Sequence, residues 1–244
     1  MIRYKVVVAY DGSAYHGWQT QHKGNSVQEQ IEDALSAIQK DKIEIHASGR
    51  TDAKVHALGQ VFHFDSFNDM DAQAYMRGLN GLLPKDIRVK HIESVDDTFH
   101  ARFYATSKRY DYYLTNDVNN PFLLHYMGKE NKVLDVEYMQ QCARLFLGTH
   151  DFTTFTSAKI DARKSRVKTI TRCEVQKEGN HYHFILEGNG FLRYMVRMIV
   201  QTIIETGKKE LSLDEVKLML ESKDKHLCRY KADASGLYLV SVTY

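Results

Sequence analysis

The sequence predicts an α+β fold built from two halves that each follow the order of a ferredoxin-like domain. Alternating apolar runs typical of strands and apolar helical faces behind capping sequences follow one another as β-α-β-β-α-β. Such halves, which also resemble RNA-recognition-motif domains, predict a continuous, mostly antiparallel sheet with helices on one side and a cleft on the open side. The length of 244 residues, with 43% hydrophobic and 26% charged residues, is typical of a globular protein.

The first half is expected to span residues 1–102. Ser26 and Glu29 form a capping box that predicts the start of its first helix. The second helix is expected from residue 69 or 71 until just before Pro84. Alternation predicts strands at residues 2–9, 42–47, 57–64 and 87–94.

The second half is expected to span residues 103–244 and to repeat this order with variations. A second capping box, Ser212 with Glu215, predicts a helix that ends near residue 221. The other helices are expected at residues 135–147 and 192–206. Strands are expected at residues 104–115, 167–177, 181–187 and 236–244.

The tetrad Gly49-Arg50-Thr51-Asp52 joins two of the expected strands and is too elaborate for a simple connector. Glycine permits an unusual backbone, and threonine can bond its own backbone. Arg50 and Asp52 can project to the same side, where a local ion pair is one explanation. An aspartate kept ionised by arginine is equally able to act as a nucleophile or general base. Spacing leaves both alternatives open.

The net charge of +2 identifies no partner, but two windows of the chain are locally basic. Residues 159–172 contain six cations and one acid, and such a run is either a solvated face or a phosphate-binding arm. Residues 98–110 interleave cations with aromatic rings, a combination that suits RNA because exposed bases stack on rings.

The sequence lacks the motifs that are typical of several classes of protein. The chain has no motif typical of nucleotide hydrolysis, dinucleotide binding, serine hydrolysis or metal binding. No apolar run approaches the roughly 20 residues that span a bilayer, and the first residues do not resemble a signal peptide. We therefore expect a cytoplasmic protein.

Six segments, in order, resemble the TruA-type tRNA pseudouridine synthase family. They are YDGSAYHGWQTQ with SVQEQIEDAL, ASGRTDAKVHALGQV, FHARFYATSKRYDYYL, HDFTTF, NGFLRYMVRMIV and SGLYLVSVTY. The similarity spans nearly the whole chain. It implies an isomerase that converts uridine to pseudouridine in the anticodon stem-loop of tRNA, at positions 38–40. It also implies a homodimer that needs no cofactor and no metal.

The resemblance assigns roles to single residues. It implies that Asp52 is the catalytic carboxylate and that Arg50 displaces the target nucleotide from its stack. It implies that Tyr110 stacks on the uracil, that Arg197 forms an ion pair with the aspartate, and that Leu237 lines the uracil pocket. The carboxylate can add to ribose C1′ or to uracil C6, and the sequence leaves both routes open.

Two departures from the family pattern stand out: Lys54 replaces the usual glycine after the tetrad, and the residues ADAS before Gly236 lack the common prolines. The role of Lys54 stays open. We expect the basic loop to hold phosphate groups of the tRNA backbone. Its candidate side chains are Arg163, Lys164, Arg166 and Lys168.

Two rival functions remain. A non-catalytic RNA-binding protein on the same fold has similar cations and aromatic rings, but it has no need for a carboxylate near phosphates. A hydrolase of glycosidic bonds usually has two acids beside the scissile bond, and these motifs supply no evident second acid. The presence of Asp52 therefore favours the isomerase.

Overall fold

The structure is a computed structural model of the chain, and it describes residues 1–21, 24–157 and 165–244. These residues form two compact units, the first made of residues 1–106 with 238–244 and the second of residues 107–237. The sequence predicts a division between residues 102 and 103, with the final strand in the second half. The structure groups that strand with the first unit.

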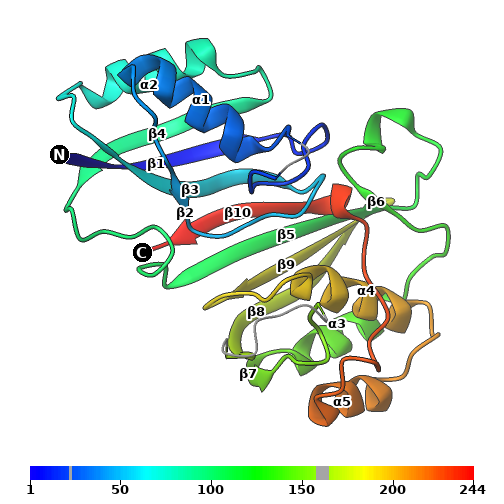
Figure 1. Cartoon of the computed structure of the whole chain (residues 1–244). Helices are drawn as coiled ribbons and strands as arrows, with labels where there is room; N and C mark the ends of the chain where they lie inside the picture. Colours follow the sequence, from blue (N-terminus) through cyan, green and yellow to red (C-terminus); the bar gives the residue numbers. More distant parts are fainter. Residues whose placement is uncertain (22–23, 158–164) are drawn as a thin grey trace. The chain divides into compact units, whose positions relative to one another are not determined.

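The first unit is a mostly antiparallel sheet with two helices on one face (Figure 1). The strand β1 is antiparallel to both β3 and β4, the short β2 is antiparallel to β3, and β10 runs parallel to β3. The elements are β1 (Ile2–Tyr10), α1 (Val27–Gln39), β2 (His46–Ala47), β3 (His56–Ser66), α2 (Ala72–Leu82), β4 (Ile87–Val95) and β10 (Leu237–Thr243), whose first residue, Leu237, is grouped with the second unit.

The core of the first unit follows from the alternation in β1, where every second side chain is buried. The Tyr4 ring packs against Phe64 of β3 and Tyr75 of α2, with ring centroids 5.3 and 4.9 Å apart. The opposite face of the sheet has a smaller cluster around Val61 and Phe99. The capping box of Ser26 and Glu29 begins α1 as predicted.

The predicted strand at residues 42–47 is mostly wrong, because only His46–Ala47 pairs with β3. Side chains of α1 take the backbone donors of the preceding residues. Ser36 Oγ accepts from the Ile43 N–H at 3.1 Å, and Glu32 Oε1 accepts from the Ile45 N–H at 3.1 Å. The apolar alternation there reflects packing against a helix and not a strand ladder.

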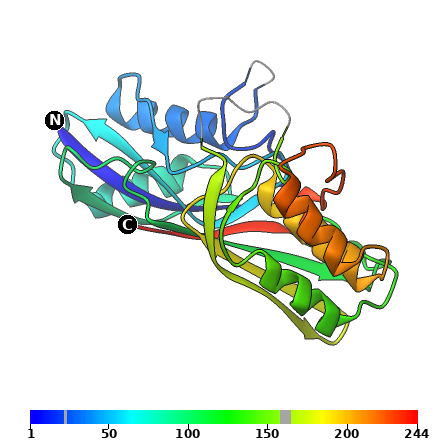
Figure 2. The same ribbon diagram turned by 90° about the horizontal axis from the view of Figure 1, so that it is seen from below.

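The second unit has a sheet in the order β5-β9-β8-β7 with antiparallel neighbours, and β6 adds a short parallel pair to β5. Its helices α3 and α5 lie next to each other (Figure 2). The elements are β5 (Ser107–Thr115), β6 (Gly128–Lys129), α3 (Val136–Leu145), β7 (Gly148–Asp151), β8 (Val167–Glu178), β9 (His181–Gly188), α4 (Met195–Gly207) and α5 (Leu213–Ser222), with 3-10 turns at Pro121–Leu123 and Ala234–Gly236.

One strand and one helix of the second unit begin three residues later than predicted. The strand expected from residue 104 begins at Ser107, because the preceding residues form a turn in which the Tyr104 N–H donates to the His100 carbonyl. The helix expected from residue 192 begins at Met195, because Tyr194 has a left-handed backbone with φ of 66°. The capping box at Ser212 is confirmed.

The predicted fold class is confirmed. The described residues form a mixed α+β protein with mostly antiparallel pairing and five α-helices. The first unit follows the predicted β-α-β-β-α-β order before β10 joins it. The tetrad lies in the loop between β2 and β3, where one end of that sheet positions it.

Candidate active site

The N-terminal side of the tetrad is held by a buried glutamine of β3. Gln60 is fully buried, and its Oε1 accepts from the Ser48 hydroxyl at 2.7 Å. Its Nε2 donates to the carbonyl of Gly49 at 2.9 Å. One amide therefore fixes both the entry to the loop and the glycine before Arg50.

The centre of the tetrad is held by two aromatic residues far away in the sequence. The hydroxyl of the buried Thr51 shares a 2.8 Å hydrogen bond with the Tyr10 hydroxyl at the end of β1. The Thr51 carbonyl accepts from the Trp18 N–H at 3.1 Å. The carbonyl of Asp52 then accepts from the Val55 N–H at 3.2 Å, which closes a turn. The backbone on both sides of the Asp52 side chain is thus fixed.

The loop that contains Trp18 packs so closely on the tetrad that two positions require glycine. A Cβ at Gly12 would lie 2.0 Å from the Val55 carbonyl oxygen, and one at Gly17 would lie 2.7 Å from the Thr51 oxygen. Gly17 also has φ of 96°, which other residues rarely adopt. The segment YDGSAYHGW is therefore a backbone support for the tetrad loop.

His56, at the start of β3, links the same loop to the last strand. The ring is buried and stacks on Tyr238 with centroids 4.6 Å apart and an interplanar angle of 17°. Its Nδ1 accepts from the Gly12 N–H at 3.1 Å. This contact gives the final strand a direct part in holding the tetrad loop, which the sequence did not predict.

Three side chains of the tetrad differ in their exposure to solvent. Thr51 is buried, Asp52 is half-buried and Arg50 is exposed. Buried polar atoms anchor the loop, while the carboxylate and the guanidinium reach its surface. The arrangement can present a carboxylate on a fixed backbone to a ligand.

Lys54, the departure from the family pattern, has a left-handed backbone with φ of 66°. Its N–H donates to the Tyr15 carbonyl at 3.3 Å, and its side chain is exposed. Glycine adopts this conformation without steric cost, whereas lysine does not. The turn therefore keeps the geometry for which glycine is suited, at some cost in backbone strain.

The other predicted site residues lie in the second unit. Tyr110, on β5, is buried, and its ring meets Phe191 edge-on with centroids 5.2 Å apart. Leu237 is buried and directly follows the 3-10 turn Ala234–Gly236. Gly236 lies against the Tyr112 ring and the Tyr113 backbone, so this segment packs on β5.

Arg197 lies in the first turn of α4 and is half-buried. Its Nε donates to the Ala232 carbonyl at 2.8 Å, and the Ala232 N–H donates back to the Arg197 carbonyl at 3.0 Å. Its guanidinium lies 5.7 Å from the centre of the Tyr194 ring. These contacts orient the charged group at one end of the helix.

The predicted site residues are divided between the two units. Arg50 and Asp52 share one loop of the first unit, while Tyr110, Arg197 and Leu237 belong to the second. The pairing of Asp52 with Arg197 stays a prediction.

Of the predicted basic-loop residues, Arg163 and Lys164 lie outside the described residues. Arg166 and Lys168 are half-buried. The Arg166 carbonyl accepts from the Phe152 N–H at 3.0 Å, and Lys168 lies opposite His150 in the β7–β8 pair.

Sequence reasoning missed the residues that hold the tetrad, above all Tyr10, Trp18 and Gln60. The glycines of YDGSAYHGW were a usable signal, since closely spaced glycines often mark close backbone approach. It also missed Tyr194, whose ring lies near three cations.

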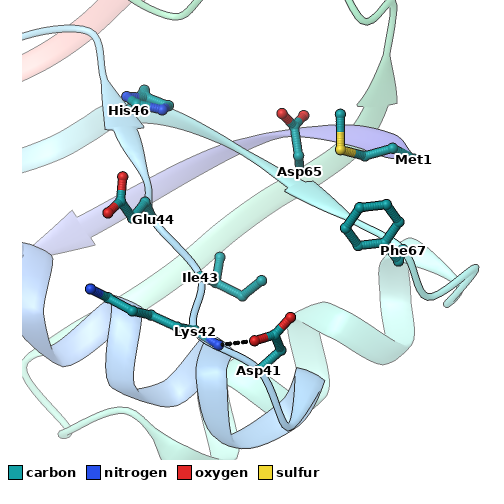
Figure 3. A pocket seen from close by; sticks show the side chains of 8 residues that line it. All are labelled: Met1, Asp41, Lys42, Ile43, Glu44, His46, Asp65 and Phe67. Carbon is teal, nitrogen blue, oxygen red and sulfur yellow. Dashed lines mark hydrogen bonds between the residues drawn. The ribbon is translucent and has the colours of Figure 1, made fainter.

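A separate hollow of about 260 Å³ lies in the first unit and includes no residue of the tetrad (Figure 3). The Asp41 carboxylate there accepts from the Lys42 N–H at 2.7 Å. The Asp65 carboxylate accepts from both Nε and Nη2 of Arg3. These two carboxylates are thus engaged in local structure. The lining residues are Met1, Asp41, Lys42, Ile43, Glu44, His46, Asp65 and Phe67.

Across the described ranges, no helix has both the length and the apolar character needed to cross a membrane. The same part of the chain has no group of three or more histidine, cysteine or acidic side chains placed to hold a metal ion.

Comparison with known proteins identifies the family. A family profile described as tRNA pseudouridine synthase matches residues 6–104 and 142–244. The chain is 43% identical over 244 residues to tRNA pseudouridine synthase A of Exiguobacterium sp., covering 100% of this chain and 98% of the relative. It is 40% identical to tRNA pseudouridine synthase A of Bacillus subtilis, covering 100% of this chain and 99% of the relative.

A solved structure described as a Cbf5-Nop10-Gar1 complex matches with a TM-score of 0.43 and 11% identity, over 97% of this chain and 48% of that chain. The family of this chain is established by the family profile and by the relatives that match over nearly their whole length, independently of this solved structure. The chain belongs to the tRNA pseudouridine synthase family, a group of isomerases.

Proposed function

We propose that this protein converts uridine to pseudouridine at positions 38–40 of the tRNA anticodon stem-loop, with Asp52 as the nucleophile. One observation carries the proposal: the half-buried Asp52 follows a buried threonine whose hydroxyl and carbonyl are both held by distant aromatic residues. A fixed backbone orients a nucleophile before the substrate arrives, which lowers the entropic cost of reaction. The tRNA positions follow from the family resemblance.

The proposed reaction breaks the bond between ribose C1′ and uracil N1 and forms a bond between C1′ and C5. The C5 carbon loses a proton and N1 gains one, so nothing is oxidised and no water is consumed. The Asp52 carboxylate adds to C1′ or to uracil C6 and holds one fragment covalently while the base rotates. Its release restores the free carboxylate.

A carboxylate in a site that excludes water needs an opposing cation to stay ionised. Arg197 is our candidate, because its guanidinium is oriented by the Ala232 carbonyl at 2.8 Å. Tyr110 supplies a ring for stacking on the uracil, with its own edge-on support from Phe191. Leu237 adds an apolar wall to the uracil pocket.

The target nucleotide must leave its stack before the carboxylate can reach it, at a cost of about a few kcal/mol. The exposed Arg50, two residues before Asp52, is placed on the same loop to displace it. We propose that the basic loop with Arg163, Lys164, Arg166 and Lys168 holds the tRNA backbone and that the protein acts as a homodimer. A tRNA substrate implies that the enzyme works in the cytoplasm.

The test of this function uses tRNA labelled with tritium at uridine C5, because that hydrogen is lost in the reaction. Asp52→Asn and Asp52→Ala are expected to fold, to bind tRNA and to release tritium at least about 10³-fold more slowly. The exposed Asp69→Asn is the matched control and should keep wild-type turnover. Turnover by the Asp52 variants near the wild-type rate would rule out the assigned nucleophile.

The same assay separates the enzyme from a non-catalytic RNA-binding protein. A wild-type protein that binds tRNA tightly and releases no tritium would be such a module. Mapping the converted uridines in unmodified tRNA tests the position: conversion confined to sites outside 38–40 would contradict that part of the proposal.

The proposed role of the basic loop has its own test. Replacing both Arg163 and Arg166 with glutamine should weaken tRNA binding and reduce its dependence on salt, since each lost phosphate contact lowers the salt slope by about 0.7–0.9. Unchanged affinity and slope would exclude the loop from backbone binding.

A further inference from the structure

Three cationic side chains lie close to the Tyr194 ring. The Arg193 guanidinium lies 4.8 Å from the ring centroid, the Lys231 ammonium 4.6 Å and the Arg197 guanidinium 5.7 Å. Arg193 Nη2 also donates to the Tyr194 hydroxyl at 2.9 Å. We name Arg193, Tyr194, Arg197 and Lys231 the Tyr194 cluster.

Hydrogen bonds hold the backbone of the two segments that carry Arg193 and Lys231. The Arg193 carbonyl accepts from the Ser157 N–H at 3.1 Å and from the Thr156 hydroxyl at 3.2 Å. Lys231 precedes Ala232, which exchanges two hydrogen bonds with Arg197. The backbone is therefore fixed at Arg193 and at Ala232, next to Lys231, so both side chains leave the chain close to the ring.

The backbone of Tyr194 supports this interpretation. The residue precedes α4 with φ of 66°, and no side chain caps the helix there. Tyrosine rarely adopts a left-handed conformation, and residues held in one often cluster at functional sites. The conformation places the aromatic ring among Arg193, Arg197 and Lys231.

The charges of the cluster all have the same sign. Among the described residues, no carboxylate lies within 4 Å of the Arg193 or Lys231 cation. Both side chains are exposed, and their distances of 4.8 and 4.6 Å to one ring centroid place them no more than 9.4 Å apart. Charges at or within this distance are only partly screened at physiological salt, where the screening length is about 8 Å, so the two cations repel. An anion bound beside both would remove this repulsion.

From this geometry we infer that the Tyr194 cluster binds a phosphate group of the tRNA backbone next to the nucleotide that the active site takes up. The inference rests on the proposed function, since Arg197 is the candidate partner of the catalytic carboxylate. Arg193 and Lys231 supply the charge, and the Tyr194 ring positions them. The cluster thus sets where the RNA backbone enters relative to Arg197.

Binding of an unmodified tRNA transcript over a series of salt concentrations tests the inference. Arg193→Gln and Lys231→Gln should each raise Kd about three- to tenfold and lower the slope of log Kd against log salt by about 0.7–0.9. With saturating tRNA, kcat should stay within about twofold of wild type, because such a contact is made equally in the ground and transition states. KM should rise with Kd.

Lys177→Gln is the matched control, because the Lys177 ammonium also lies over a tyrosine ring, at 5.4 Å from Tyr182, outside the cluster. It should leave Kd and the slope unchanged. Tyr194→Phe keeps the ring and loses only the hydroxyl that accepts from Arg193, so it should bind more tightly than a variant without the ring. Tyr194→Asn tolerates the left-handed backbone but removes the ring, so it should weaken binding.

The outcomes are distinguishable. If wild type releases tritium but the double variant of Arg193 and Lys231 binds like Lys177→Gln, the inference is overturned and the proposed function stands. If wild type releases no tritium, the proposed function fails, and the salt slopes still decide whether the cluster binds RNA. Equal tRNA affinities of Tyr194→Asn and Tyr194→Phe would show that the ring does not position Arg193 and Lys231.

Discussion

The hydroxyls of Tyr10 and Thr51 share a buried hydrogen bond of 2.8 Å, which ties the end of β1 to the residue before Asp52. The strand β1 pairs with β3 on one side and β4 on the other, so it is flanked on both edges. Through this bond, a loop that connects two other strands takes its position from β1. The proposed nucleophile is therefore held by the sheet and not by its loop alone.

Thr51→Val tests this relationship, since valine keeps the shape of threonine and removes the hydroxyl. We expect the free energy of unfolding to fall by about 1 kcal/mol. A shift of the carboxylate should lower kcat by roughly 10- to 100-fold, while Kd for tRNA stays unchanged. Tritium release and urea unfolding measure both effects. Thr51→Ser keeps the hydroxyl and should restore kcat, and failure of that rescue would contradict a positioning role.

Tyr110 should contribute both a stacking surface and a hydroxyl. Tyr110→Ala is expected to lose the stacking, worth about 1–3 kcal/mol per base. Tyr110→Phe keeps the ring and should bind tRNA normally, but kcat should fall about 10²-fold if the hydroxyl assists proton transfer at C5. Single-turnover tritium release with separate binding measurements distinguishes the two.

Tyr113→Phe is the control for this pair, because Tyr113 lies on the same strand with its ring stacked on His183. It should leave turnover unchanged. A wild-type rate for Tyr110→Phe would restrict Tyr110 to stacking.

Lys54→Gly should stabilise the protein, because glycine adopts the left-handed backbone seen at this position, where φ is 66°. The relief of strain is partly offset by the greater entropy of glycine in the unfolded chain, so we expect a gain of about 0.5–1 kcal/mol in the free energy of unfolding. Urea unfolding measures it. Lys85→Gly, in an exposed turn without positive φ, should destabilise; equal effects of the two substitutions would disprove the strain.

Burial lowers the pKa of His63 to about 4, and the nearby His100, His46 and Arg3 add to this effect while Asp65 opposes it. The folded state holds the neutral ring, whose Nδ1 accepts from the Ala101 N–H at 3.2 Å. The unfolded state takes up a proton near pH 6.5. Stability from this group is therefore complete above about pH 6.5 and is lost as the pH falls toward 4, by about 2 kcal/mol at pH 5.

Urea unfolding of wild type and His63→Gln at pH 7.5 and pH 5 checks this. The variant should lose less stability on acidification than wild type. His226→Gln, an exposed histidine of the second unit, should behave like wild type. Parallel losses in wild type and His63→Gln would show that another group controls the acid sensitivity.

Much of the fold was predictable because its signals are local. The alternation in β1 and β9 and the capping boxes at Ser26 and Ser212 gave elements that the structure contains. The segment before His46 was mispredicted because its backbone donors bind the α1 side chains Glu32 and Ser36, and apolar alternation does not reveal a partner.

The sequence by itself determined the family, the α+β class and the candidate nucleophile. Motifs and hydrophobic periodicity depend only on residues that are close together in the sequence. Only the tertiary structure decided that Tyr10, Trp18 and Gln60 hold the tetrad loop. Only it placed Lys231 beside the Tyr194 ring. Such contacts depend on where distant segments meet, and any hydroxyl, amide or ammonium group has many possible partners until the chain folds.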